Sequence, residues 1–162
     1  MRPAIRSIRS IREAAANVIA VDSCVLIDLL GEDASRADAA EACVRDALAQ
    51  GPVVLCDVVV SEITAGLGHG ADIMDVVEEM GLRYLPVDRR AAIRAGEMQR
   101  RHKERRQAAG MTGLLPRTVP DFIVGAHALL QCSALITRDA GFFRDYFKGL
   151  KLIVPQPVTD SP

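Results

Sequence analysis

Residues 18–30 read VIAVDSCVLIDLL, and this stretch decides the fold. Its first four residues, 18–21, are apolar and predict a short strand that is buried on both faces. Asp22 closes that strand. Ser23 can cap a short helix that stops at Gly31. The stretch therefore predicts a strand and a helix that meet at a carboxylate.

The alternation of strand-like and helix-like segments continues along the chain. Further strands are predicted at 53–56, 82–86, 134–137 and 151–154. Further helices are predicted at 36–49, 58–67, 71–80, 89–109, 120–131 and 140–147. Strands separated by helices imply right-handed crossovers. We therefore expect an α/β fold: a single three-layer domain with a central, mostly parallel sheet of four to five strands and helices on both faces.

Composition agrees with one domain. The chain has 162 residues, of which 49% are hydrophobic and only 4% aromatic. The core must therefore consist mostly of Val, Ile, Leu and Ala. We assign residues 17–155 to the domain, 1–16 to a basic amphipathic extension and 156–162 to a flexible tail.

Several features favour a cytoplasmic protein. No apolar run approaches the 18 residues that a membrane helix needs, so no membrane span is expected. The basic and apolar stripes of residues 1–16 lack the long apolar core of a secretory signal. The four cysteines form no CxxC pair, and the three histidines are not spaced to complete a zinc site. Reduced, buried thiols are expected.

One segment is strongly basic although the net charge of the chain is −1. Residues 89–106 carry eight Lys and Arg against two Glu. This charge is typical of a surface that contacts phosphates, but it also fits a solvated helix face or a site for an acidic partner. The candidate RNA contacts are Arg100, Arg101, Arg105 and Arg106.

Four acidic residues follow the predicted strands: Asp22, Glu62, Asp121 and Asp139. In a parallel sheet, the carboxyl ends of the strands face one crevice. Carboxylates that converge there repel one another unless a hard divalent cation lies between them. The pattern therefore predicts a Mg²⁺ or Mn²⁺ site. Each acid could instead be a helix cap. Asp28 is a neighbour that could be confused with the site residues, and Asp57 is expected to cap the helix that carries Glu62.

Short motifs surround these acids. Asp22-Ser23 opens an apolar helix, and Asp121 lies in Pro-Asp-Phe-Ile-Val-Gly-Ala-His-Ala. Asp139 ends Thr-Arg-Asp and is followed by Ala-Gly-Phe. With Glu62 after the second strand, the chain resembles the PIN-domain ribonucleases over about residues 18–154, most closely the VapC toxins of bacterial toxin–antitoxin pairs. Gly125 stands where that pattern often has alanine, a departure that should be tolerated.

The resemblance implies a metal-dependent endoribonuclease that hydrolyses RNA and is held inactive by a cognate antitoxin. It also implies a homodimer. We expect Asp22 and Asp121 to be the direct or nearly direct metal ligands. Glu62 and Asp139 complete the site, one of them through water. The hydroxyl groups of Ser23 and Thr137 are expected to orient the carboxylates.

Other interpretations remain open at this point. One is a PIN module for housekeeping RNA processing, or for binding RNA or a partner with weak catalysis. A metal-dependent phosphatase on another α/β scaffold is a second, but Cys24 occupies the position where aspartyl-phosphate phosphatases need an Asp. His127 is expected to be a packed or surface residue. Phe142, Phe143, Tyr146 and Phe147 are expected to belong to the core.

Overall fold

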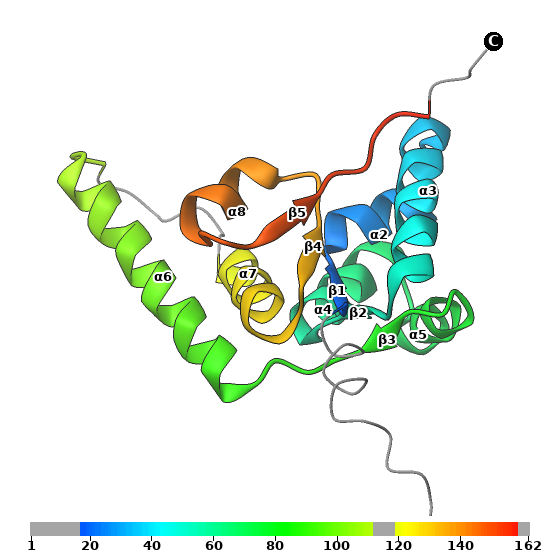
Figure 1. Ribbon diagram of the computed structural model, residues 1–162, viewed down its shortest axis with the longest axis horizontal. Helices are drawn as coiled ribbons and strands as arrows, with labels where there is room; N and C mark the ends of the chain where they lie inside the picture. Colours follow the sequence, from blue (N-terminus) through cyan, green and yellow to red (C-terminus); the bar gives the residue numbers. More distant parts are fainter. Residues whose placement is uncertain (1–16, 112–118, 159–162) are drawn as a thin grey trace, which may run out of the picture.

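The computed structural model describes residues 17–111 and 119–158. The predicted extension at 1–16, most of the segment between the predicted helices at 89–109 and 120–131, and the end of the predicted tail lie outside these ranges. The described chain forms a five-stranded sheet in the order β3-β2-β1-β4-β5, in which every pair of neighbours is parallel. Helices α6, α7 and α8 lie on one side of the sheet, and α3 and α5 lie on the other (Figure 1). The predicted α/β fold is confirmed.

The strands are short, and the central ones are buried. Their bounds are β1 Ile19–Val21, β2 Val53–Leu55, β3 Arg83–Tyr84, β4 Ala134–Ile136 and β5 Lys151–Ile153. Every residue of β1, β2 and β4 is buried, whereas the edge strand β3 is exposed. Because β1 pairs with both β2 and β4, it is the centre of the sheet.

Helices connect the strands close to the predicted positions. Their bounds are α2 Ser23–Leu30, α3 Ala34–Gln50, α4 Asp57–Leu67, α5 Gly70–Glu79, α6 Arg89–Ala108, α7 Val119–Gln131 and α8 Ala140–Tyr146. In the described ranges, no helix combines the length and apolarity that crossing a bilayer requires.

Two predicted helix caps are wrong. The cap of α2 is Asp22, one residue before Ser23, because its carboxylate accepts a hydrogen bond from the Ser23 N–H at 2.8 Å. Helix α4 begins after Cys56, which makes no side-chain cap. The Asp57 carboxylate instead accepts hydrogen bonds from the Tyr84 hydroxyl at 2.6 Å and from the Val87 N–H at 2.7 Å. It ties α4 to the segment that follows β3.

The core is aliphatic, with one aromatic group beside α7. Phe143 and Phe147 are fully buried, as expected for the core, and Phe122 is fully buried as well. Tyr146 and Phe142 are partly buried, and their ring centroids lie 5.1 Å from that of Phe122. These rings fix α8 against the first turns of α7. His127 is also buried, so it is a packed histidine, and burial lowers its pKa.

Gly125 has a packing reason for its lack of a side chain. A Cβ atom at this position would lie 2.3 Å from Cε2 of Phe147. The Phe147 ring therefore occupies the space that an alanine methyl group would need. The departure from the family pattern is thus matched by the ring of Phe147, the residue that ends α8.

We expect Gly125→Ala to lower the free energy of unfolding by about 1–3 kcal/mol, the usual cost of overpacking a core. Gly96→Ala is the matched control, because Gly96 is exposed in the middle of α6 and a Cβ there meets nothing within 4 Å. That change should raise stability by about 0.5–1 kcal/mol through helix propensity. Denaturant unfolding measures both, and an unchanged Gly125→Ala midpoint would contradict the packing argument.

Candidate active site

Asp22 is the most firmly held of the four predicted acids. It lies between β1 and α2 and is only 5% exposed. Its Oδ1 accepts a hydrogen bond from the Ser23 N–H, and its Oδ2 accepts one from the Thr137 hydroxyl at 2.7 Å. The Cys24 thiol donates to the same Oδ2 at 3.4 Å. Burial raises the pKa of Asp22, and these three donors oppose the rise.

Thr137 connects this carboxylate to Asp139. Its side chain is fully buried at the end of β4, and its Oγ1 accepts a hydrogen bond from the Asp139 N–H at 3.0 Å. Asp139 is exposed and precedes α8, but its carboxylate makes no capping hydrogen bond to that helix. These hydrogen bonds agree with the predicted role of Thr137 in orienting the carboxylates. The Asp139 carboxylate remains available for other contacts because it does not cap α8.

The donors from α2 differ from those expected. Ser23 contributes its backbone N–H to Asp22 rather than its hydroxyl. Cys24, which the sequence reasoning did not include, contributes the thiol. Burial and the Asp22 charge raise the pKa of Cys24 to about 11, so it remains a protonated donor at neutral pH. The position of Cys24 in the first turn of α2, two residues after Asp22, was the feature of the sequence that could have predicted this contact.

Asp121 and Glu62 complete the acidic site from two other helices. Asp121 lies in the first turn of α7 and is half-buried, and Glu62 lies on α4 with similar burial. Burial raises the pKa of Asp121 to about 6, and the charges of Asp22, Glu62 and Asp139 add to the rise. All four predicted acids therefore lie near enough to influence one carboxyl group.

The arrangement is open rather than a closed cage. Within the described residues, no three His, Cys, Asp or Glu side chains are close enough to hold an ion between them. Mg²⁺ keeps several of its waters and often binds proteins through only one or two carboxylates. Oxygen donors, mutual repulsion and an open geometry together fit a Mg²⁺ or Mn²⁺ ion held partly through water.

Asp28 does not belong to this group. It is 9% exposed, and its Oδ2 lies 2.6 Å from Nε of Arg138. Arg138 is the residue between Thr137 and Asp139. The neighbour that could have been confused with a metal ligand is therefore the ion-pair partner of an arginine at the edge of the site.

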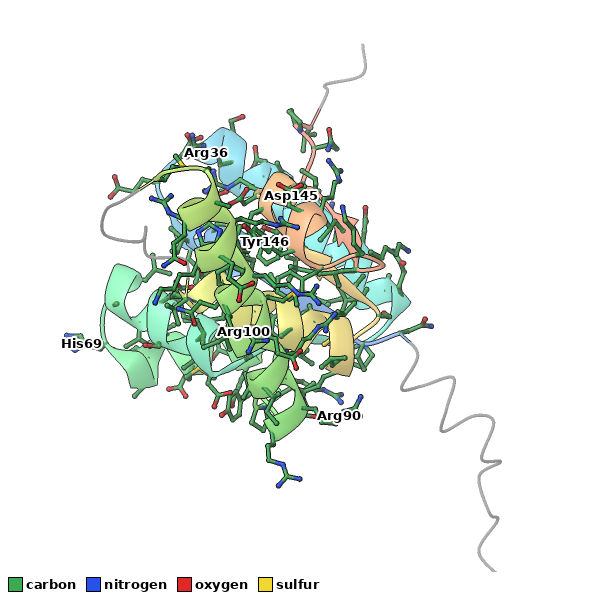
Figure 2. The ribbon with its side chains drawn as sticks, turned by 90° about the vertical axis from the view of Figure 1, so that its left-hand side faces the viewer. Arg36, His69, Arg90, Arg100, Asp145 and Tyr146 are labelled. Carbon is green, nitrogen blue, oxygen red and sulfur yellow. The ribbon has the colours of Figure 1, made fainter. Side chains whose placement is uncertain are left out.

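The basic helix α6 packs against α7, the helix that carries Asp121. Its His102 ring lies 5.6 Å from the Phe122 ring, and Phe122 follows Asp121 in the chain. His102 is also hydrogen-bonded to the Tyr146 hydroxyl, and the Arg105 guanidinium lies 5.1 Å from the centre of the Tyr146 ring. Figure 2 shows Arg100 midway along α6 and Tyr146 of α8 beside the second half of that helix. The candidate RNA contacts are Arg100, Arg101 and Arg105, which are exposed, and Arg106, which is half-buried.

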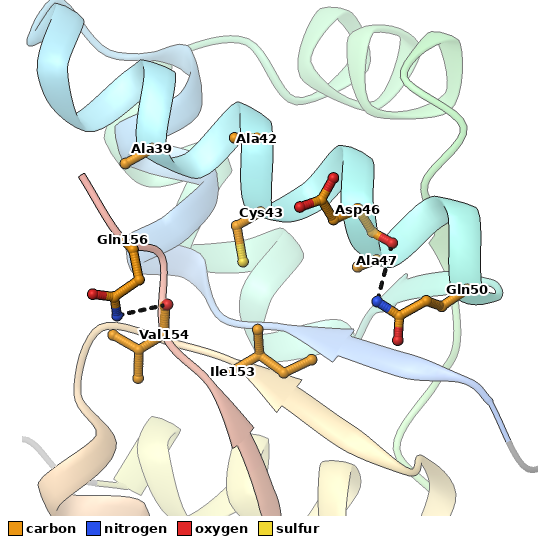
Figure 3. Close-up of a pocket in the computed structure, with 9 residues that line it drawn as sticks. All are labelled: Ala39, Ala42, Cys43, Asp46, Ala47, Gln50, Ile153, Val154 and Gln156. Atoms are coloured by element: carbon orange, nitrogen blue, oxygen red, sulfur yellow. Dashed lines mark hydrogen bonds between the residues drawn. The ribbon is translucent and has the colours of Figure 1, made fainter. Parts of the chain in front are cut away.

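A separate groove of about 290 Å³ lies between α3 and β5 (Figure 3). Cys43 and Asp46 line it from α3, and Ile153 and Gln156 line it from the C-terminal segment. None of the four site carboxylates borders this groove, so it is not part of the acidic site.

The model of the PIN-domain family matches residues 19–148. The chain belongs to the PIN-domain family. No curated protein sequence matches it. Among solved structures it is similar to VapBC2 from Rickettsia felis, bound to a DNA fragment from their promoter, with a TM-score of 0.64 and 12% identity over 85% of this chain and 98% of that one.

Other similar structures come from further bacteria. A toxin–antitoxin complex from Klebsiella pneumoniae gives a TM-score of 0.57 and 20% identity over 86% of this chain and 99% of that one. VapBC-5 from Mycobacterium tuberculosis gives a TM-score of 0.51 and 17% identity over 86% and 98%. At these low sequence identities, the similarity shows a shared fold only. The predicted resemblance to PIN-domain toxins is confirmed at that level.

The raised pKa of Asp121 predicts a pH-dependent stability without metal. Its ionised form costs stability above about pH 6, and the cost disappears below about pH 4, where the carboxyl group is protonated in both folded and unfolded chains. We therefore expect Asp121→Asn to be the more stable protein at pH 7.5. Solvent screening and the loss of the favourable interaction with the helix dipole both reduce this effect. The free energy of unfolding should therefore rise by about 1 kcal/mol.

Denaturant unfolding in the presence of a chelator measures this difference at pH 7.5 and pH 4. Asp46→Asn, an exposed change on α3, is the control and should be neutral at both pH values. A destabilised Asp121→Asn protein at pH 7.5 would contradict the electrostatic description of the site.

Proposed function

We propose that this protein is an endoribonuclease that depends on Mg²⁺ or Mn²⁺. The observation that carries the proposal is a set of four acids in a PIN-family fold: Asp22 after β1, Asp139 after β4, Asp121 in the first turn of α7 and Glu62 on α4. Burial and the charges of the other three acids raise the pKa of Asp121, which agrees with their proximity. A site that only bound RNA would gain nothing from gathering negative charge where phosphates must approach. A divalent cation would remove that conflict.

The protein side chains would divide the work as follows. Asp22 and Asp121 would hold the ion directly or nearly so, and Glu62 and Asp139 would complete the site, one of them through water. When bound, the ion supplies a nucleophilic water and relieves charge on the phosphoryl oxygens. Thr137, the Cys24 thiol and the Ser23 N–H would keep the Asp22 carboxylate in one orientation, because all three donate to it.

The basic second half of α6 would guide the RNA strand. Helix α6 carries Arg100, Arg101, Arg105 and Arg106. Its His102 packs against Phe122, which directly follows Asp121 in the chain. Phosphates bound there would continue toward the acidic site. A solvated helix face is the alternative, and a charge-reversal variant separates the two.

The similar structures support a biological setting for this proposal, because some of them are described as toxin–antitoxin complexes or systems. We assign to this chain the role of a cytoplasmic toxin that works as a homodimer and is neutralised by a cognate antitoxin. A small open reading frame directly upstream of its gene would support this role. An isolated gene would favour housekeeping RNA processing, and a module that only binds RNA or a partner would cleave no RNA.

Cleavage of RNA by the purified protein tests the proposal. We expect cleavage with Mg²⁺ or Mn²⁺, none with a chelator, and a loss of at least about 100-fold in Asp22→Asn and Asp121→Asn, more than the loss usual for residues that only support metal ligands. Asp46→Asn should retain wild-type activity. Wild-type activity in either site variant would remove the assignment.

A binding assay with the same RNA tests the role of the basic helix α6. Arg100→Glu combined with Arg101→Glu should weaken RNA binding and reduce its dependence on salt. Arg45→Glu is the control, since Arg45 is exposed on α3 and forms an ion pair with Glu41 of the same helix. If the α6 variant binds as the wild type does, the helix is a solvated face.

A further inference from the structure

Arg138 belongs to a segment that is fastened to α2 at two points. The preceding residue, Thr137, donates its hydroxyl to Asp22, the cap of α2. The side chain of Arg138 reaches further along α2, where its Nε lies 2.6 Å from Oδ2 of Asp28. The arginine is thus held by its guanidinium group and follows a residue that is itself hydrogen-bonded to the cap of α2.

The ion pair is asymmetric in its exposure. The Asp28 side chain is 10% exposed, whereas the Arg138 side chain is 43% exposed. A buried carboxylate without its partner costs several kcal/mol, so Asp28 keeps the arginine in place. The approach is through Nε, and across the described parts of the chain the two terminal nitrogens of Arg138 have no other acidic partner. The donors that remain therefore belong to the exposed end of the side chain.

The position of this exposed end matters because Arg138 directly precedes Asp139. The acidic site repels a phosphodiester strand everywhere except where a cation lies, and Arg138 places a fixed cation at the edge of the site. A guanidinium group presents a planar fork of donors that matches two phosphate oxygens. An arginine that is already immobilised loses less side-chain entropy when it binds such a group.

We propose that Arg138, held by Asp28, binds the backbone phosphate of the RNA strand next to the one that is cleaved. The inference rests on the proposed ribonuclease function and adds a substrate-binding residue to it. Asp28 is then a positioning residue that acts through the arginine. The competing explanation is that the pair only fastens the segment between β4 and α8 to α2.

The test compares full-length Arg138→Ala, Arg138→Lys and the double variant Arg138→Ala/Asp28→Asn with the wild type. The double variant is needed because Arg138→Ala alone leaves a buried carboxylate unpaired and can lower stability. Arg45→Ala is the matched control, since it removes an exposed, ion-paired arginine from α3. Two quantities are measured: kcat and KM for RNA cleavage, and the binding of a short single-stranded RNA without divalent ions over a series of salt concentrations.

We expect Arg138→Ala and the double variant to raise KM about ten-fold, the loss of one charge-assisted contact, with kcat unchanged within about two-fold. The slope of log K against log salt should fall by about 0.7, the value for one phosphate contact on a single strand. Arg138→Lys should recover part of the affinity, because it keeps the charge and loses the fork.

Other results would overturn the inference. A double variant with wild-type KM and salt slope, or variants that lower kcat and leave KM unchanged, would mean that the pair only fastens the segment. The binding series needs no cleavage, so it decides the role of Arg138 even if the protein proves not to be a nuclease. A wild-type protein that neither binds nor cleaves the RNA when Mg²⁺ or Mn²⁺ is present would overturn both proposals.

Discussion

Repulsion among carboxylates is the constraint around which this structure is built. Asp22, Glu62, Asp121 and Asp139 come from four separate places in the sequence. Burial, together with the charges of the other three acids, raises the pKa of Asp121 to about 6. The fold holds them together because each is attached to a rigid element near the carboxyl end of the sheet. Burial of β1, β2 and β4 supplies the energy that offsets the repulsion.

The contacts around the site keep the carboxylates in defined positions. The three donors on Asp22 come from α2 and from the end of β4, so the same hydrogen bonds that orient this acid also join those two elements. The ion pair between Asp28 and Arg138 joins the same elements one turn further on. On the other side, packing of His102 against Phe122 sets the basic helix α6 beside the helix that carries Asp121.

Local features of the sequence predicted the order and limits of most elements. Apolar runs of four residues marked the central strands. Asp88 directly precedes the helix predicted at 89–109, and it caps α6, since its carboxylate accepts a hydrogen bond from the Ala91 N–H. The four acids were selected as candidates by their position after these strands, and their role as site residues stays a prediction. Local signals work here because strand burial and helix caps depend on residues that are close in the chain.

Interactions between distant residues could not be predicted in the same way. The pairs Asp28–Arg138, Asp57–Tyr84 and Gly125–Phe147 each join separate elements, and no pattern of spacing encodes them. The expected cap at Asp57 failed for this reason, because a hydroxyl group on β3 competes for its carboxylate. The Ser23 hydroxyl was expected to orient a carboxylate, but it is the Ser23 backbone N–H that donates to Asp22. The Cys24 thiol, which also donates to Asp22, was overlooked because a thiol is a weak donor.

Calorimetric titration with Mn²⁺ at pH 7.5 is the most direct test of the central claim that these carboxylates form a metal site. The account predicts saturable binding to the wild-type protein, strongly weakened binding to Asp22→Asn and unchanged binding to Asp46→Asn. Absence of binding to the wild type, or equal binding to Asp22→Asn, would contradict it.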